Sequence, residues 1–330
     1  MRAPLQSRVN PGEAAQLAAA RAGDEHAFAQ LTSPYRPELQ VHCYRMLGSL
    51  HDAEDLVQET MLRAWRWLDA FEGRTSLRRW LYKIATNACL NALEREPRLV
   101  LIPTGDEAAS PPLARVNWLE PYPDTLLPDA GDPQARLDLR ESVALAFLAA
   151  IQYLPPRQRA MLVLFDVLSW SAAEIAELLE TSTAAVNSGL QRARATLADR
   201  PAPRATEREE QVLVERFVAA WERVDIAGLV ELLREDAVLA MPPEPLWFAG
   251  RDAVGEFFAT VPAGGDLTRI KLAPTSANLR PAVAAYFDGQ AYGIMVFEID
   301  GGRISQIVGF ADAAKSFDRF GLPERLETLG

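Results

Sequence analysis

The stretch that decides the fold of this 330-residue chain begins Asp52-Ala-Glu-Asp-Leu-Val-Gln-Glu-Thr60 and continues at Leu77-Arg-Arg-Trp-Leu-Tyr-Lys-Ile-Ala-Thr-Asn87. Apolar residues recur in both parts at a spacing of about 3.6 residues, which is typical of amphipathic helices. The spacing predicts one helix over about residues 52–68 and another over about residues 77–95, joined by a short loop. Each helix is expected to bury one face in a bundle and to expose the other.

The two predicted helices carry opposite charge. Residues 52–60 hold four acidic residues and no basic one, whereas residues 73–95 hold five basic residues against one acid, Glu94. An acidic face suits a basic protein partner, and a basic face with Trp80 and Tyr82 suits nucleic acid, because aromatic rings stack on unpaired bases. The alternative is two solvated faces of an ordinary bundle, since charge runs usually mark such faces.

With Trp65 and Phe71 between them, these helices make residues 28–95 resemble region 2 of the extracytoplasmic-function (ECF) sigma factors of bacterial RNA polymerase. The resemblance implies that the acidic helix binds the polymerase core and that the following loop and helix melt and read the −10 promoter element. The residues that it assigns to the core are Asp52, Asp55, Gln58 and Glu59. Those that it assigns to −10 DNA are Gly73, Arg74, Thr75, Ser76, Arg79, Lys83, Asn87 and Asn91. The first four of these would surround a base that is flipped out of the stack.

The composition limits the class of protein. Hydrophobic residues make up 49% and charged residues 24%, as in soluble globular proteins. The chain has no apolar run of roughly 18 residues and no apolar signal segment after Met1, so we expect a cytoplasmic protein without a membrane span. Cys43 and Cys89 fall in predicted helices and are expected to be reduced packing residues. The three histidines are scattered, and we assign no metal site and no cofactor.

The net charge of −11 does not exclude DNA binding, because the distribution of charge matters more than its sum. Residues 207–330 hold 12 basic and 20 acidic residues, which gives −8. Most of the excess acid therefore lies outside the segments expected to bind DNA.

Residues 1–22 are expected to be a short lead, and residues 98–138 a proline-rich acidic linker. The centre of this linker, with Trp118 and Tyr122, is too aromatic for a pure spacer. We expect these two rings to dock on another domain, with an incidental apolar segment as the alternative. In the ECF sigma factors, which residues 28–95 resemble, the linker between the two DNA-reading domains threads the active-site cleft of polymerase.

Residues 139–200 are predicted to form a helix-turn-helix, with two packed bundle helices as the alternative. Ser171-Ala-Ala-Glu174 is a capping box, and Ser182 can cap the helix that follows the turn at Glu180-Thr181. The segment resembles region 4 of the same family, which reads the −35 element. The residues expected to enter the major groove are Ala184, Asn187, Ser188, Gln191, Arg192 and Arg194. A glycine is usual near Glu180, and residues 140–200 carry no net charge, so −35 affinity is expected to be low without polymerase.

After a second linker at residues 201–208, residues 209–325 show helices followed by antiparallel strands, which predicts an α+β domain. Gly301-Gly302 after Asp300 indicates a hairpin. The segment resembles the cone-shaped SnoaL-like domains of the nuclear-transport-factor-2 superfamily, which enclose a pocket. The candidate residues of that ligand pocket are Trp221, Met241, Trp247, Phe257, Tyr286 and Tyr292. Some relatives are isomerases or cyclases, but this domain has no histidine and Asp236 is expected to be a cap or a solvated acid, so no catalytic residue is assigned.

The chain is thus predicted to be multidomain, with two all-α sigma domains and a C-terminal α+β cone-shaped SnoaL-like domain. The sigma domains are a region 2 helical bundle at residues 23–97 and a region 4 helix-turn-helix at residues 139–200. We expect it to direct bacterial RNA polymerase core to promoter DNA, regulated in cis by the C-terminal domain, to which an anti-sigma protein or a small ligand could bind. Two alternatives stay open: a small-molecule isomerase or cyclase, and a ligand-sensing DNA-binding regulator that never touches polymerase.

Overall fold

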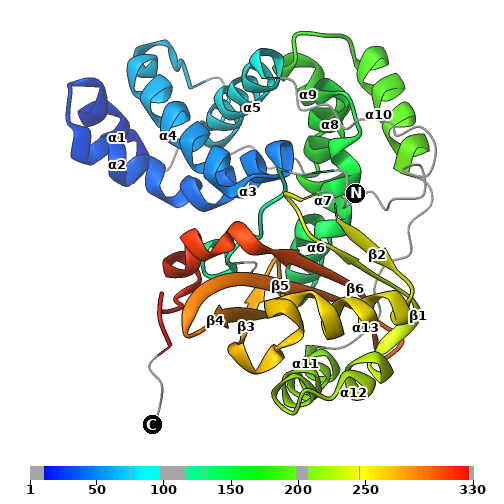
Figure 1. Ribbon diagram of the computed structural model, residues 1–330. Helices are drawn as coiled ribbons and strands as arrows, with labels where there is room; N and C mark the ends of the chain where they lie inside the picture. Colours follow the sequence, from blue (N-terminus) through cyan, green and yellow to red (C-terminus); the bar gives the residue numbers. More distant parts are fainter. Residues whose placement is uncertain are drawn as a thin grey trace. The chain divides into compact units, whose positions relative to one another are not determined.

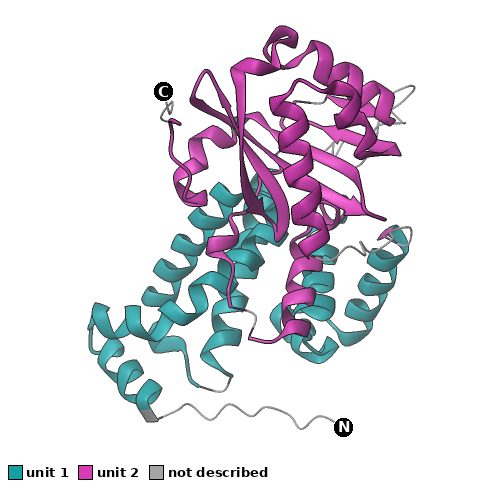
Figure 2. Ribbon diagram, turned by 90° about the horizontal axis from the view of Figure 1, so that it is seen from below, with its two compact units in different colours: residues 1–98, 154–196 teal, residues 99–153, 197–330 magenta. Residues whose placement is uncertain are grey.

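A computed structural model describes residues 11–73, 75–96, 116, 118–129, 131–197, 207–244 and 246–326. The chain divides into two compact units (Figure 2). The first consists of residues 1–98 and 154–196, and the second of residues 99–153 and 197–330. No helix in the described part of the chain is long and apolar enough to cross a membrane.

The described residues of the first unit fold into helices joined by turns (Figure 1). The helices from the N-terminal segment are α1 (Pro11–Arg21), α2 (Glu25–Thr32), α3 (Arg36–Leu47), α4 (Leu50–Arg66) and α5 (Leu77–Arg95). Those from the later segment are α8 (Pro156–Leu162), α9 (Ala172–Leu178) and α10 (Thr183–Leu197).

Helices α3, α4 and α5 pack around an apolar core, as their periodicity predicts. Ala53, Leu81 and Ala85 are fully buried there. Helix α4 begins two residues earlier than expected because the side chain of Ser49 accepts a hydrogen bond from the backbone N–H of Asp52 (3.1 Å). The expected region 2 bundle is therefore present.

Both cysteines lie in this core. Cys43 on α3 and Cys89 on α5 are free and fully buried. A hydrogen bond to Cys43, together with burial, raises the pKa of the Cys89 thiol well above its usual value. A buried protonated thiol is unreactive, which fits packing residues.

Helices α9 and α10 form the expected helix-turn-helix. Ser171 accepts from the backbone N–H of Glu174 (3.3 Å) while the Glu174 carboxylate accepts from the N–H of Ser171 (2.8 Å), so the predicted capping box is confirmed. Ser182 caps α10 by accepting from the N–H of Ala185 (3.1 Å). The turn places Glu180 at φ 53°, a left-handed conformation that explains why glycine is favoured there.

In the second unit, helices α6 (Pro133–Val143) and α7 (Leu145–Gln152) precede an α+β domain. Its sheet has the order β2-β1-β6-β5-β4-β3. The strands are β1 (Leu233–Ala240), β2 (Trp247–Ala249), β3 (Ile270–Ala277), β4 (Arg280–Phe287), β5 (Gln290–Asp300) and β6 (Arg303–Phe310). The helices of this domain are α11 (Glu207–Glu222), α12 (Ile226–Glu231) and α13 (Arg251–Thr260).

The sequence predicted antiparallel strands, but one pair of strands in the sheet is parallel. Strand β1 runs parallel to β6, because the chain passes through the whole hairpin series β3 to β6 before it returns to β1. The predicted hairpin is present: Asp300 pairs with Arg303, and Gly301 and Gly302 both have positive φ, as a two-residue turn between strands requires.

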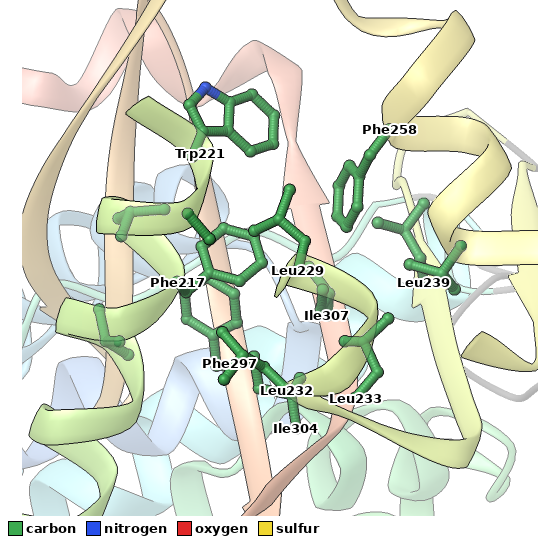
Figure 3. Close-up of a cluster of buried hydrophobic side chains, with 14 of the residues drawn as sticks. Phe217, Trp221, Leu229, Leu232, Leu233, Leu239, Phe258, Phe297, Ile304 and Ile307 are labelled. Atoms are coloured by element: carbon green, nitrogen blue, oxygen red, sulfur yellow. The ribbon is translucent and has the colours of Figure 1, made fainter. Parts of the chain in front are cut away.

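The core of this domain lies between the sheet and helices α11 to α13 (Figure 1). Figure 3 shows Phe217 and Trp221 of α11 next to Phe258 of α13 and Phe297 of β5. The ring centroids of Phe217 and Phe297 are 4.9 Å apart, and those of Trp221 and Phe258 are 5.5 Å apart. Aromatic contacts of this kind add to the area that they bury, so the two layers are held by a dense aromatic core.

Candidate functional site

The residues predicted to contact polymerase follow the exposed side of α4. Asp55 and Gln58 are exposed, whereas Asp52 and Glu59 are half-buried. Glu59 forms an ion pair with Arg63 at 2.5 Å, one helical turn further on. The opposite face of α4 is buried in the bundle, so the helix presents an acidic surface whose position is fixed by its apolar side.

The loop between α4 and α5 contains the residues predicted to hold a flipped base. Gly73 has φ 72° and is exposed, so a side chain at this position would be strained. Thr75 is exposed, and the Ser76 hydroxyl caps α5 by accepting from the backbone N–H of Arg79 (3.3 Å). Arg74 lies outside the described residues.

The predicted −10 residues of α5 share one side of the helix. Arg79 and Asn91 are exposed, and Lys83 and Asn87 are half-buried, so none of the four points into the packed interior. Beneath them, fully buried Tyr82 belongs to the core. The surface needed for a nucleic-acid contact therefore exists on α5.

Two of these cations already have carboxylate partners within the first unit. Arg79 pairs with Glu174 of α9, and the Lys83 Nζ lies 3.7 Å from the Glu180 carboxylate in the turn after α9. Sequence reasoning missed these pairs, because no pattern within α5 indicates what a helix about 90 residues later brings against it.

The outward side of α10 carries all six predicted −35 residues. Ala184, Asn187, Ser188, Gln191, Arg192 and Arg194 are exposed. Arg194 forms an ion pair with Asp166, which raises the pKa of the arginine, and its guanidinium lies 5.3 Å from the centre of the Phe165 ring. Helix α10 is thus suited to enter a groove, with Arg194 already held in place.

In the second unit, the linker docks on the C-terminal domain. Fully buried Asn278, in the turn between β3 and β4, accepts a side-chain hydrogen bond from the backbone N–H of Tyr122 (2.9 Å). Its own backbone N–H donates to the Tyr122 carbonyl (2.8 Å), and its side-chain amide donates to the Val143 carbonyl (2.8 Å). The Asp124 carboxylate accepts from the N–H of Leu279 (2.7 Å), and burial raises its pKa. The expected docking is confirmed for Tyr122, while Trp118 is half-buried.

A group of buried charges fastens α6 to the same domain. Arg140 of α6 forms an ion pair with Glu210 of α11. Arg280 of β4 lies 4.0 Å from Glu210 and 3.0 Å from the carboxylate of Glu298 on β5. Burial raises the pKa of Glu298, although Arg280 opposes that shift. Removing one partner of a buried ion pair is strongly destabilising, so the pair between Arg140 and Glu210 ties α6 to the domain.

A pocket of about 100 Å³ opens between the sheet and α13. Four of the six predicted pocket residues line it: Trp221, Met241, Phe257 and Tyr292. The described lining residues include no Asp, Glu, His, Lys or Arg. The Trp221 indole N–H already donates to the Ile270 carbonyl (3.1 Å), so the hydroxyl of half-exposed Tyr292 is the remaining N–H or O–H group among the side chains of these lining residues.

The other two predicted pocket residues, Trp247 and Tyr286, do not line it. Phe248 packs on Phe257 with centroids 4.7 Å apart, so the alternation of a strand turns its neighbour Trp247 to the other side. Tyr286 follows an irregularity in the pairing of β4, stacks edge-on against Phe317 and donates to the Pro323 carbonyl (3.0 Å). Side-chain alternation separates Trp247 from Phe248 once the face of one of them is known, whereas the irregularity before Tyr286 leaves no signal in the sequence.

Asp236 does not have the features of a general base. It is exposed and hydrogen-bonded to Arg234 (2.7 Å), which lowers its pKa. Among the described residues, no group of His, Cys, Asp and Glu is arranged to hold a metal ion.

Comparison with known proteins gives three matches in chain order. Residues 31–98 match Sigma-70 region 2, residues 144–197 match Sigma-70, region 4, and residues 214–307 match the SnoaL-like domain. The chain is 46% identical over 327 residues to the ECF RNA polymerase sigma factor SigG of Mycobacterium tuberculosis, covering 93% of this chain and 86% of that protein. It is 31% identical over 176 residues to the ECF sigma factor SigW of Bacillus subtilis, covering 53% and 89%.

A solved structure matches most of the chain. The crystal structure of the ECF sigma factor SigJ of Mycobacterium tuberculosis matches with a TM-score of 0.58 and 25% identity, covering 88% of this chain and 98% of that one. The fold and its surfaces thus define a sigma factor with an appended SnoaL-like domain. The chain belongs to the ECF family of RNA polymerase sigma factors. It serves promoter-specific initiation of transcription with the polymerase core and is not an enzyme itself.

Proposed function

We propose that this sigma factor holds the polymerase core with the exposed side of α4 and promoter −10 DNA with the loop and outer side of α5, while α10 reads the −35 element. The observation that carries the assignment is that Asp55 and Gln58 are exposed on α4 while Arg79 and Asn91 are exposed on α5 of the same bundle. An acidic surface suits a basic protein, and a cationic surface suits phosphate. The protein accordingly acts in the cytoplasm, where its polymerase is.

The assignment can be tested by binding to purified polymerase core. Asp55→Ala with Gln58→Ala should weaken core binding roughly tenfold or more, as expected when central interface residues are removed. The matched control is Asp69→Ala with Glu94→Ala, which removes exposed acids outside α4. Equal affinity of both double variants would show that α4 is not the contact. Run-off transcription on genomic fragments then reports the promoter.

We propose further that the C-terminal domain regulates the sigma factor by holding the linker. Asn278 fixes Tyr122 and Val143, and Glu210 fixes Arg140, so the segment between the two DNA-reading regions is bound in one register. Regions 2 and 4 read two elements at a set spacing on DNA, and a held linker limits how far apart they can move. Deletion of residues 207–330 should therefore change promoter-dependent transcription, and unchanged activity would contradict this role.

The pocket of the C-terminal domain supports a small neutral ligand as the signal, and an anti-sigma protein is the alternative partner. A cavity of roughly 150 Å³ is enough for benzene, so about 100 Å³ limits the ligand to a comparable size unless side chains move. The test is thermal unfolding of the full chain with benzene or xenon as the probe. Stabilisation that Ala285→Leu abolishes would support the pocket; no stabilisation at saturation would refute it.

A further inference from the structure

The N-terminal helix α1 belongs to the first compact unit, although the Sigma-70 region 2 match begins only at residue 31. It lies beside α2 (Figure 1). In the turn between the two helices, Gly23 has φ 96° and the N–H of Asp24 donates to the Ala19 carbonyl (3.1 Å). The Asp24 side chain then caps α2 by accepting from the N–H of Ala27 (3.0 Å). Helix α1 is therefore joined to α2 by an ordered turn.

Contacts with the rest of the bundle hold this pair of helices. Phe28 of α2 is buried, and its ring packs edge-to-face with Trp65 of α4, with ring centroids 5.1 Å apart. Near the start of α1, the Glu13 carboxylate accepts a hydrogen bond from the Tyr35 hydroxyl (3.4 Å). These contacts determine where Arg21, the last residue of α1, lies.

Arg21 reaches the entrance of the loop that is proposed to hold a flipped base, residues 72–76. Its guanidinium donates to the backbone carbonyl of Phe71, which directly precedes that loop. The N–H of Phe71 donates to the Leu68 carbonyl (3.2 Å), and its buried ring packs on Trp80 of α5 with centroids 5.1 Å apart. Phe71 is thus held through its ring and through both of its backbone polar groups.

A fixed carbonyl at Phe71 fixes the first step of the loop. A carbonyl and the N–H of the next residue lie in one rigid plane, so the held carbonyl also sets the direction of the following N–H. Gly73, at φ 72°, then turns the chain. At the exit, Ser76 caps α5, and Arg78 donates to both carboxylate oxygens of Glu38 on α3 (2.9 and 2.6 Å). Both ends of the loop are therefore fixed in the protein without DNA.

We propose that Arg21 is a positioning residue for −10 recognition: by holding the Phe71 carbonyl, it keeps residues 72–76 in the shape that receives a flipped base. This inference rests on the proposed role of that loop. A base that leaves the stack loses its stacking energy, and a loop that had to become ordered on binding would add a cost in entropy. A loop that is ordered in advance avoids this cost and so increases the affinity for the base.

A direct phosphate contact is the competing role for Arg21, because its side chain is exposed and a guanidinium has five donors. The two roles differ in their dependence on the flipped base. A phosphate contact carries no base information, so it would strengthen binding equally with or without the base. A positioning residue should matter only when a base enters the loop. Removal of that base therefore separates the two roles.

The first experiment measures the contact without DNA. Arg21→Met in the full chain keeps the apolar stem and removes the donors, and it should speed hydrogen exchange of the Phe71 amide roughly threefold to tenfold. Exchange within α3 and α5 should stay the same, which shows that the bundle is folded. The matched control is Arg36→Met, which removes another exposed arginine of the same bundle. Equal exchange at Phe71 in the two variants would overturn the contact, whatever the loop binds.

The second experiment locates the flipped base. A promoter found by run-off transcription on genomic fragments is made into a template whose −10 strands are already separated. Abasic sites are placed one at a time in its non-template strand, and binding of the holoenzyme reconstituted from core and the full chain is measured. One abasic position should weaken binding roughly tenfold, as expected when a base contact is lost. If no position did so, the proposed −10 role of the loop would fail, and the inference with it.

The third experiment combines the two changes. On the intact template, holoenzyme with Arg21→Met should bind roughly threefold to tenfold more weakly than holoenzyme with Arg36→Met. On the template with the sensitive abasic position, the two variants should bind equally, because a shaped loop gains nothing when the base is missing. An equal loss on both templates would assign Arg21 to a phosphate contact and overturn the positioning role. Absence of any loss on the intact template would overturn it as well.

Discussion

Asn278 makes three hydrogen bonds to backbone groups of a segment more than 130 residues earlier in the chain. It adopts φ 57°, a left-handed conformation that asparagine tolerates better than most residues. In the sequence it reads as an ordinary turn residue between two strands, since Asn is common in two-residue turns. What the sequence does not show is that the turn is buried beneath Tyr122.

Two substitutions of Asn278 separate the effect of its side-chain hydrogen bonds from that of its left-handed backbone conformation. Asn278→Asp keeps the acceptor for the Tyr122 N–H but removes the donor to the Val143 carbonyl, and it adds a buried charge. We expect a loss of about 2–4 kcal/mol in the free energy of unfolding of this unit, because a polar group is left unsatisfied next to a carboxylate. Urea unfolding followed by hydrogen exchange of the peptide around Tyr122 measures it. Asn278→Gly, which relieves the backbone but loses both side-chain bonds, should also destabilise, and a neutral result for both would contradict the role.

His42 gives the first unit a dependence on pH. It is fully buried, with its Nε2 2.9 Å from the Thr86 hydroxyl, and burial with the charges of Arg45 and Arg78 lowers its pKa from 6.5 to about 3. As pH falls from about 6.5 towards 3, the unfolded chain binds a proton that the folded one does not. The free energy of unfolding should therefore fall by up to about 1.4 kcal/mol per pH unit in that window.

The measurement is urea unfolding at several pH values, with hydrogen exchange of α3 and α5 as the readout. His42→Gln should remove most of this slope. His51→Gln changes an exposed histidine and should keep the slope of the parent protein. Parallel slopes for the parent and His42→Gln would show that another group is responsible.

At the scale of secondary-structure elements, the end of α9 departs from the usual pattern. The N–H of Thr181 donates to the Ala176 carbonyl (2.9 Å) and that of Glu180 to the Glu177 carbonyl (3.4 Å), the two bonds of a Schellman ending. Such an ending favours glycine where Glu180 stands at φ 53°. Glu180 stands at a backbone position that strains it, and its side chain reaches towards Lys83.

Glu180→Gly should therefore stabilise the helix-turn-helix by about 1 kcal/mol relative to Glu180→Gln, since both lose the charge and only glycine relieves the strain. Thermal unfolding combined with hydrogen exchange of α9 compares the two variants. If the Glu180→Gly variant were no more stable than the Glu180→Gln variant, the left-handed conformation at position 180 would not be strained.

Most elements were predictable, and the exceptions have physical reasons. Helix α5 was placed at its observed bounds, because its apolar stripe and the serine before it are local signals. The parallel pairing of β1 with β6 was not predictable, because the sequences of two strands about 70 residues apart do not show that they pair. Trp247 and Tyr286 were wrongly predicted to line the pocket for a related reason, because the sequence of a strand does not show which face of the sheet an aromatic residue takes.

At the scale of the whole molecule, the compact units do not follow the order of the sequence regions. Residues 99–153 belong with the C-terminal domain, although residues 99–143 lie between regions 2 and 4 in the chain and residues 144–153 are the start of the region 4 match. The family and its function were predictable from the strings around Asp52 and Leu77 together with the order of regions. The contacts of Glu174 and Asn278 were not, since each depends on a partner distant in sequence.

Truncation after residue 206 should expose the docked segment. Val116, Leu119 and Tyr122 are buried, and without Asn278 and its neighbours their backbone loses its partners. We expect limited proteolysis to cut the truncated chain within residues 116–129 at least tenfold faster than the full chain, because cleavage follows local opening. Mass spectrometry of the fragments gives the sites. Equal rates in both chains would mean that the segment is protected by something other than this domain.

The place of β6 between β1 and β5 affects how the protein is made. The sheet cannot close until Phe310 has been synthesised, whereas α10 ends at Leu197. At roughly 5–20 residues per second, translation of the intervening stretch takes on the order of ten seconds. During that interval the promoter-reading helices of each new chain already exist, while their own C-terminal restraint is still being made on the ribosome.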